Sequence, residues 1–273
     1  MPFDLSLIAI PALLLIVGGL AGTLAGLFGV GGGIIMVPML SSGLAMLGTQ
    51  HDTAMHVAVA TSLATIIPTS LMSFRTHMKQ GSVDTAILRE AVTWIVLGAM
   101  AGSFIASQIS AKYISLFFVG LCGFMIWHYL AKDHLNVAPS FMPGPIVRGV
   151  LCLGIGLFSS IMGIGGGVLG VVMLTAFGLP IHRAVSTAAA FGLIVAVPST
   201  IINALHEVEG FVPFGTIGTI HPLGILLLTP TAMIMARIGA RWAHKISAKK
   251  LKGAFVILIS IIGAKMLIST LMF

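Results

Sequence analysis

The amino-acid sequence predicts an all-α protein, a polytopic bundle of about ten transmembrane helices arranged as two inverted five-helix repeats. Three observations predict this fold. The 273 residues are 58% hydrophobic and only 8% charged, whereas soluble domains carry about 25% charged residues. Long apolar runs recur along the chain without the apolar–polar alternation of barrel strands. A glycine-rich motif from the first half returns in the second half.

The membrane helices are predicted from the apolar runs in chain order. A helix rises about 1.5 Å per residue, so about 20 apolar residues cross the hydrocarbon core of a bilayer. Short segments with Pro, Gly or charged residues separate the runs. We expect helices at 6–28, 34–48, 56–74, 88–107, 113–131, 147–162, 168–180, 184–205, 221–237 and 250–271.

The basic residues predict the orientation of these helices. With ten spans, all but two of the 14 Lys and Arg residues fall in one set of connections, and Lys112 and Lys265 fall in the other. The positive-inside rule places the basic set in the cytoplasm and both termini outside. The net charge of +7 is therefore interpreted as a topology signal, and we expect no nucleic-acid binding. No Lys or Arg precedes Arg75, so we expect no cleaved signal peptide and a retained first helix.

Three sequence matches in register indicate an internal repeat. Gly29–Gly33 (G-V-G-G-G) returns as Gly163–Gly167 (G-I-G-G-G), and Ile109–Lys112 returns as Ile246–Lys249. Pro68–Ser70 resembles Pro198–Thr200 in the same order. Each half then holds five helices, and an odd number inverts the second half relative to the first. We expect a first repeat at 1–135, a connecting loop at 136–145 and a second repeat at 146–273.

The glycine-rich segments carry the strongest chemical signal. Each precedes an apolar run that is too short to cross the membrane, at 34–48 and 168–180. Short, Gly-interrupted segments at matching places in two halves indicate a transport site near the midplane. Glycine lets a ligand approach the backbone, and the first N–H groups of the following helix attract anions without Lys or Arg. The predicted anion site comprises Gly31, Gly32, Gly33, Gly165, Gly166 and Gly167.

These glycines have two other interpretations. Small residues also allow membrane helices to pack closely, and this alternative stays open. Residues 165–170 fit the pattern G-x-G-x-x-G, but no strand precedes them, so we reject a dinucleotide-binding fold.

Hydroxyl and amide side chains in the third and eighth helices are further candidates for substrate binding. On the third helix, Thr61, Thr65 and Thr69 are spaced by four residues and share one face. Their alternative role is to bond back to the carbonyls of their own helix. The predicted substrate contacts on the two helices are Thr61, Ser62, Thr65, Thr187 and Asn203, with Ser186 and Ser199 nearby.

The sequence does not favour an enzyme or a metal site. None of the nine histidines lies three or four residues from another, so no helical His pair is available to a metal. No G-x-S-x-G nucleophile or intramembrane carboxylate pair is present. We therefore expect no catalytic residue, no metal and no cofactor, and leave the roles of His206 and His221 open.

The paired G-[VI]-G-G-G segments, the small chain and its two halves resemble the TauE/SafE family of sulfite exporters and related anion transporters. The resemblance covers essentially the whole chain. It implies a multi-pass carrier of a bacterial inner membrane for sulfite, thiosulfate, a sulfonate or a similar small organic anion. The lipid bilayer would surround it, and a homodimer is compatible with it.

The resemblance leaves several questions open. It does not choose the anion, the direction of transport, the coupling ion or the oligomeric state. A passive anion channel would share the same charge pattern and glycine motifs. A membrane enzyme or an assembly factor is less favoured, because neither requires two matched glycine turns.

Overall fold

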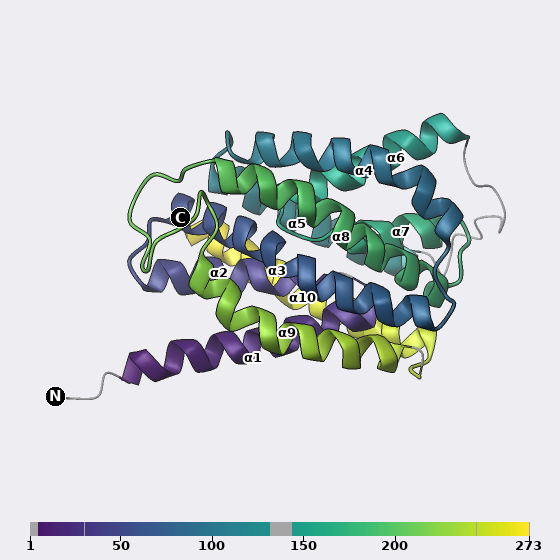
Figure 1. The fold of residues 1–273 in the computed structure, drawn as a ribbon, viewed down its shortest axis with the longest axis horizontal. Coiled ribbons are helices and arrows are strands. Elements are labelled where there is room, and N and C mark those ends of the chain that lie inside the picture. The colour runs from purple at the N-terminus through teal and green to yellow at the C-terminus, as the bar shows by residue number, and fades with distance from the viewer. Residues whose placement is uncertain (1–4, 30, 132–143, 244, 273) are drawn as a thin grey trace.

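The computed structural model describes residues 5–29, 31–131, 144–243 and 245–272, and ten helices lie within them (Figure 1). The first five are α1 (Leu5–Phe28), α2 (Gly33–Met46), α3 (His51–Lys79), α4 (Thr85–Ala106) and α5 (Ala111–Ala131). The second five are α6 (Pro145–Ile161), α7 (Gly167–Ala176), α8 (Ile181–Leu205), α9 (Pro222–Ala243) and α10 (Ala248–Met272).

The all-α fold and the ten expected helices are confirmed. Four described helices, α3, α4, α8 and α9, are long and apolar enough to cross a membrane. The main differences from the expected spans lie at helix ends. Helix α3 extends beyond 56–74 on both sides, because the apolar run measures the lipid-compatible part of a helix and not its polar terminal turns. Helix α7 has only 10 residues and is shorter than expected.

The helices run along one long axis, and α1 begins at the same end of the bundle where α10 ends (Figure 1). We call this the acidic end, because Asp52, Glu207 and Glu209 lie there beside the start of α3 and the end of α8. The opposite, basic end holds Arg75, Lys79, Arg89, Arg183 and Arg241 near the end of α3, the starts of α4 and α8 and the end of α9.

Glycines allow two outer helix pairs to pack in backbone contact. On α1, a Cβ atom added at Gly22 would overlap the Ala232 backbone of α9. On α6, a Cβ added at Gly156 would overlap the carbonyl oxygen of Ile95 in α4. Because lipid tails are as apolar as the side chains, such close packing stabilises membrane helix pairs. The pairs α1–α9 and α4–α6 therefore form two walls of the bundle.

Helices α3 and α8 cross in the centre and run antiparallel (Figure 1). Near the basic end the Ser186 Oγ lies 3.2 Å from the His77 Nδ1. At the acidic end the Thr53 hydroxyl donates to the carbonyl oxygen of Glu209 over 2.8 Å. Most of the α3 side chains between these points are buried, so α3 forms the core of the protein.

The helix contacts follow the repeat seen in the sequence. If α1–α5 correspond to α6–α10 in order, the α1–α9 pair corresponds to α6–α4 and the α3–α9 pair to α8–α4, and all four contacts are present. The α2–α3 contact likewise corresponds to α7–α8. The connecting loop at 136–145 lies almost entirely outside the described residues, since 132–143 are not described.

Lys265 lies inside α10, as the expected helix at 250–271 predicts, and not in a connection between helices, where the charge count had placed it. Its Nζ is 3.4 Å from the carbonyl oxygen of Pro38 in α2. The long side chain lets the ammonium group reach a backbone acceptor from the apolar part of the helix.

Candidate functional site

The two glycine turns meet in the interior of the bundle. A Cβ added at Gly33 would overlap the carbonyl oxygen of Gly163 and would lie 3.0 Å from the Ile164 Cα. The first turn depends on glycine for its backbone, because Gly31 and Gly32 have φ angles of 76° and 85°, where side chains are disfavoured. Both turns are buried, although Val30 lies outside the described residues.

Each turn packs on the long central helix of the other half. A Cβ added at Gly29 would overlap the carbonyl oxygen of Val185 in α8. A Cβ added at Gly163 would lie 2.9 Å from the Val59 Cα in α3. The absence of side chains therefore brings the two turns together across the α3–α8 crossing.

The side chain of Ile66, on α3, lies between the two turns. Its Cγ2 is 3.0 Å from a Cβ added at Gly31, and its Cδ1 is 3.0 Å from one added at Gly33. On the other side, the same Cγ2 is 2.8 Å from a Cβ added at Gly165. Ile66 is fully buried, so its side chain fills the space between the turns in this structure.

Two hydroxyl groups of α3 bond to the turns directly. The Ser62 hydroxyl donates to the carbonyl oxygen of Gly163 over 2.9 Å. The Thr69 hydroxyl lies 3.4 Å from the carbonyl oxygen of Gly31, and it also donates to carbonyls of its own helix, at Thr65 and Ile66, over 3.1 Å. Thus α3 holds both turns in place.

Not every predicted glycine faces the centre. Gly31, Gly33 and Gly165 do, but Gly32 lies against α1, where an added Cβ would be 2.8 Å from the Ala21 carbonyl oxygen. At Gly166, an added Cβ would be 2.9 Å from the Val195 Cγ2. Gly167 begins α7 and is buried. Gly32 and Gly166 are therefore surrounded by helix packing.

The predicted polar residues also fall into two groups, those that contact a glycine turn and those that bond elsewhere. Of the five predicted substrate contacts, only Ser62 bonds to a turn. The Thr61 hydroxyl accepts the His221 N–H over 2.9 Å, and the Thr65 hydroxyl donates back to the Thr61 carbonyl over 2.9 Å. The Thr187 hydroxyl accepts the N–H of Asp84 near the basic end. Asn203 lines a pocket at the acidic end.

Three central residues were missed by the sequence reasoning. Ile66 is one, and its apolar side chain gave no chemical signal. Ser70 and Gly192 are the others: the Ser70 Oγ is 3.2 Å from a Cβ added at Gly31, and the Gly192 Cα is 3.2 Å from one added at Gly165. The repeat could have identified Gly192, because the offset between Pro68 and Pro198 aligns it with Ser62.

Buried hydroxyls extend from this centre toward both ends. Ser70 and Ser73 lie one helical turn apart on α3, toward the basic end, and Ser199 lies on α8, toward the acidic end. Each is at most 1% exposed, and the Oγ of each has no hydrogen-bond partner among the described residues. A buried hydroxyl without a partner is costly, so these three residues mark places where a polar ligand or water gains a bond.

The acidic-end pocket is a poor resting place for an anion. It has a volume of about 340 Å³ and lies between the start of α3 and the segment after α8. Its lining includes the carboxylates of Asp52, Glu207 and Glu209 beside His56 and His206. Three carboxylates repel a negative ligand, so this pocket does not favour anion binding.

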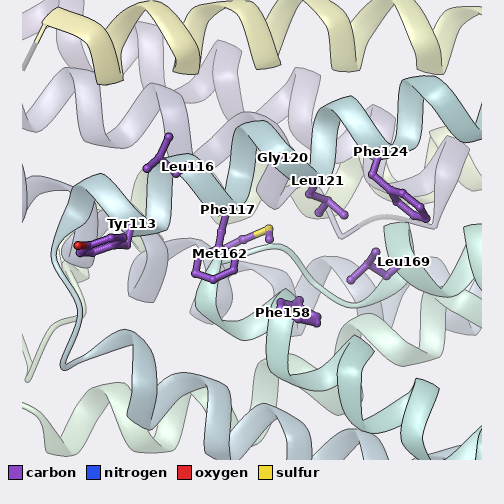
Figure 2. Close-up of a pocket in the computed structure, with 9 residues that line it drawn as sticks. All are labelled: Tyr113, Leu116, Phe117, Gly120, Leu121, Phe124, Phe158, Met162 and Leu169. Atoms are coloured by element: carbon purple, nitrogen blue, oxygen red, sulfur yellow. The ribbon is translucent and has the colours of Figure 1, made fainter.

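A larger groove, of about 540 Å³, lies on the outer side of α5 (Figure 2). Figure 2 shows Phe117 and Met162 side by side, with Tyr113 and Phe124 toward opposite ends. Its lining residues carry no charged side chain and, apart from Tyr113, no polar one, so the groove offers little to stabilise an anion. The central glycine turns therefore remain the candidate site.

Metal binding has little support among the residues that the structure describes. Among the described residues, no group of three or more His, Cys, Asp or Glu side chains could hold a metal ion. His221 instead supports the segment between α8 and α9, with its Nε2 2.8 Å from the Pro213 carbonyl oxygen and its Nδ1 accepting the Gly224 N–H over 3.0 Å.

Comparisons with known proteins agree with a transporter. The family model described as sulfite exporter TauE/SafE matches residues 14–266. A probable membrane transporter protein of Haemophilus influenzae is 32% identical, over 93% of this chain and 97% of the relative. Similar proteins with the same description occur in Methanocaldococcus jannaschii (28% identical, 94% and 95% covered) and Bacillus subtilis (26%, 93% and 96%). No solved structure matches the chain.

Proposed function

This chain belongs to the sulfite exporter TauE/SafE family, and from that premise we propose that it is a secondary transporter that moves a small anion across the membrane by alternating access. The observation that carries the proposal is the meeting of two matched glycine turns, each at the start of a helix, across the central α3–α8 crossing. Sulfite is the first substrate to test, followed by thiosulfate and small sulfonates.

The backbone supplies the positive charge in this proposal. The N–H groups in the first turn of a helix are not used by the helix itself. A helix N-terminus carries about half a positive charge, so α2 and α7 together offset about one negative charge. In α7, the Gly170 N–H donates the first i to i−4 helical hydrogen bond, to the Gly166 carbonyl oxygen over 2.9 Å. The N–H groups of Val168 and Leu169 precede it and make no such bond within the helix.

The hydroxyl groups complete the proposed path. Ser70 and Ser73 would receive the anion on the basic side of the turns, and Ser199 on the acidic side. Hydroxyl donors bind oxyanions without a buried cation, which favours release as well as binding. The absence of Lys and Arg from the described α3 and α8 residues around the turns fits a substrate that must leave quickly.

Alternating access requires two halves that move against one another. The matched helix pairs α1–α9 and α6–α4 support an inverted repeat, in which the first five and last five helices exchange roles. We place the basic end in the cytoplasm of a bacterial cell, with both termini outside, because of the positive-inside rule. No catalytic role is proposed for the chain.

Counterflow tests this function. Purified protein in liposomes loaded with unlabelled sulfite should take up labelled sulfite faster than empty proteoliposomes, and the uptake should saturate. A carrier exchanges anions one for one, so internal sulfite accelerates entry. Flux that rises linearly with concentration and shows no counterflow would favour the alternative, a passive anion channel. Absence of any anion flux or binding would refute both.

A further inference from the structure

We propose that Ile66 sets the size of the anion that the transporter accepts, because its side chain occupies the space between the two glycine turns. This inference rests on the proposed function and adds to it a residue that determines specificity. It concerns one side chain on α3, which neither the glycine motif nor any polar signal identifies.

The contacts of Ile66 place its side chain in the proposed site. Its Cγ2 faces both turns, because it lies 3.0 Å from a Cβ added at Gly31 and 2.8 Å from a Cβ added at Gly165. Its Cδ1 lies 3.0 Å from a Cβ added at Gly33 and 3.4 Å from a Cβ added at Gly165. One aliphatic side chain thus occupies the volume where an anion would meet both helix N-termini.

The repeat makes this position asymmetric. The offset that aligns Pro68 with Pro198 aligns Ile66 with Ala196, and both are fully buried. The matching position in the second half therefore carries a much shorter side chain than Ile66. The Cδ1 end of Ile66 can turn about χ2, while β-branching fixes χ1 in a helix and backbone contacts fix the turns.

The surroundings explain why moving Ile66 would admit an anion. Ser70 lies one turn from Ile66 on α3, and its unpartnered Oγ lies beside Gly31. Ser62 lies one turn away on the other side and is bonded to Gly163. Ile66 therefore separates the hydroxyls on its two sides, and the volume it vacates defines how large an anion can pass between them.

The experiment compares anions of increasing size in proteoliposomes. The series is sulfite, methanesulfonate, ethanesulfonate, propanesulfonate and butanesulfonate, and each uptake rate is divided by the sulfite rate of the same variant. Ile66→Ala removes Cγ1, Cγ2 and Cδ1, and should shift the size limit to longer sulfonates. We expect about tenfold faster relative uptake of the first anion that the wild type rejects, since one methylene changes discrimination by about that factor or more.

Two further variants keep the test decisive. Ile66→Val removes only Cδ1, preserves most of the packing and should shift the limit by a smaller step in the same direction. The matched control is Leu63→Ala, because Leu63 is equally buried on α3 but is not among the nearest neighbours of the turn glycines. Its size limit should equal that of the wild type.

The outcomes separate this inference from the function on which it rests. A wild type that transports sulfite, together with Ile66 variants that keep its size limit, would overturn the role of Ile66 and leave the proposed function standing. A shift of equal size in Leu63→Ala would also overturn it, since a general loosening would then be the cause. A folded wild type that transports no member of the series would overturn the proposed function and this inference together.

Discussion

Gly33 at the start of α2 lies directly against the carbonyl group of Gly163, the first residue of the second glycine turn. The two residues are far apart in the sequence and belong to different halves of the chain. Their contact joins the halves at the centre of the bundle, where even one methyl group would not fit. These glycines are therefore required for the two turns to meet.

The first prediction concerns this contact. Gly33→Ala should destabilise the protein by about 1–3 kcal/mol, because the added methyl group meets a backbone carbonyl that cannot move freely. The matched control is Gly43→Ala in the same helix, where nothing lies within 4 Å of an added Cβ. The control should retain or gain stability, by about 0.5–1 kcal/mol at most. Thermal unfolding in detergent measures both, and equal melting temperatures would contradict the contact.

The second prediction concerns the bond between α3 and the second turn. Ser62→Ala removes the donor to the Gly163 carbonyl and should cost about 1 kcal/mol. Ser103→Ala is the control, because Ser103 is buried in α4 and its Oγ has no hydrogen-bond partner among the described residues. The two variants should differ in unfolding midpoint, with Ser103→Ala at or above the wild type. A reversed order would show that Ser62 does not hold the turn.

The third prediction tests the α4–α6 wall with two glycines of one helix. Gly156→Ala should lower stability by about 1–3 kcal/mol, because the new methyl group overlaps the Ile95 carbonyl. Gly154→Ala should be tolerated, because nothing lies within 4 Å of its added Cβ. Denaturant or thermal unfolding of the purified variants distinguishes them. Equal stability of the two variants would contradict the close contact between Gly156 and α4.

The fourth prediction concerns orientation. Ser247 and Gly210 are exposed at the basic and acidic ends of the bundle, so Ser247→Cys and Gly210→Cys should react with a membrane-impermeant maleimide from opposite sides. Background labelling should be low, because both native cysteines, Cys122 and Cys152, are buried. In intact cells we expect only Gly210→Cys to be labelled. Labelling of both from the same side would refute the topology.

Much of the fold could be predicted from the sequence because the bilayer imposes simple rules. A chain with few charges must form helices of membrane length, and hydropathy reports the length. The repeat then predicted that the glycine turns correspond, and the contact between Gly33 and Gly163 brings them together. Helix ends such as His51 and Lys79 were missed, because polar terminal turns carry no apolar signal.

The candidate site was predicted less completely, for a physical reason. A pattern of hydroxyls shows which residues can bond, but a neighbouring backbone group often satisfies them first. The Thr65 hydroxyl donates to a carbonyl of its own helix, and the Thr61 hydroxyl accepts the N–H of His221. Ile66 has no polar group at all, so only the three-dimensional contacts reveal its position between the turns.

The structure also changes which glycine variants are informative. The sequence alone suggests Gly32→Val and Gly166→Val as tests of the anion site. Gly32 packs on α1 with a φ angle of 85°, and Gly166 packs on Val195. Side chains there would disturb packing whether or not an anion binds nearby. Gly165 faces Ile66 between the turns and has no positive φ angle. An added Cβ there meets the Ile66 Cγ2 at 2.8 Å and the Gly192 Cα at 3.2 Å, so Gly165→Ala changes the proposed site itself.

The measurement that tests the central claim most directly is sulfite binding to purified Gly165→Ala, by calorimetry on protein shown to be folded. Gly154→Ala serves as the control, because its methyl group meets nothing within 4 Å. If the anion binds between the two glycine turns, Gly165→Ala should lose at least about 1.4 kcal/mol of binding free energy, a tenfold weaker affinity, while the control binds as the wild type does. Wild-type affinity in folded Gly165→Ala would contradict the account and place the anion site elsewhere.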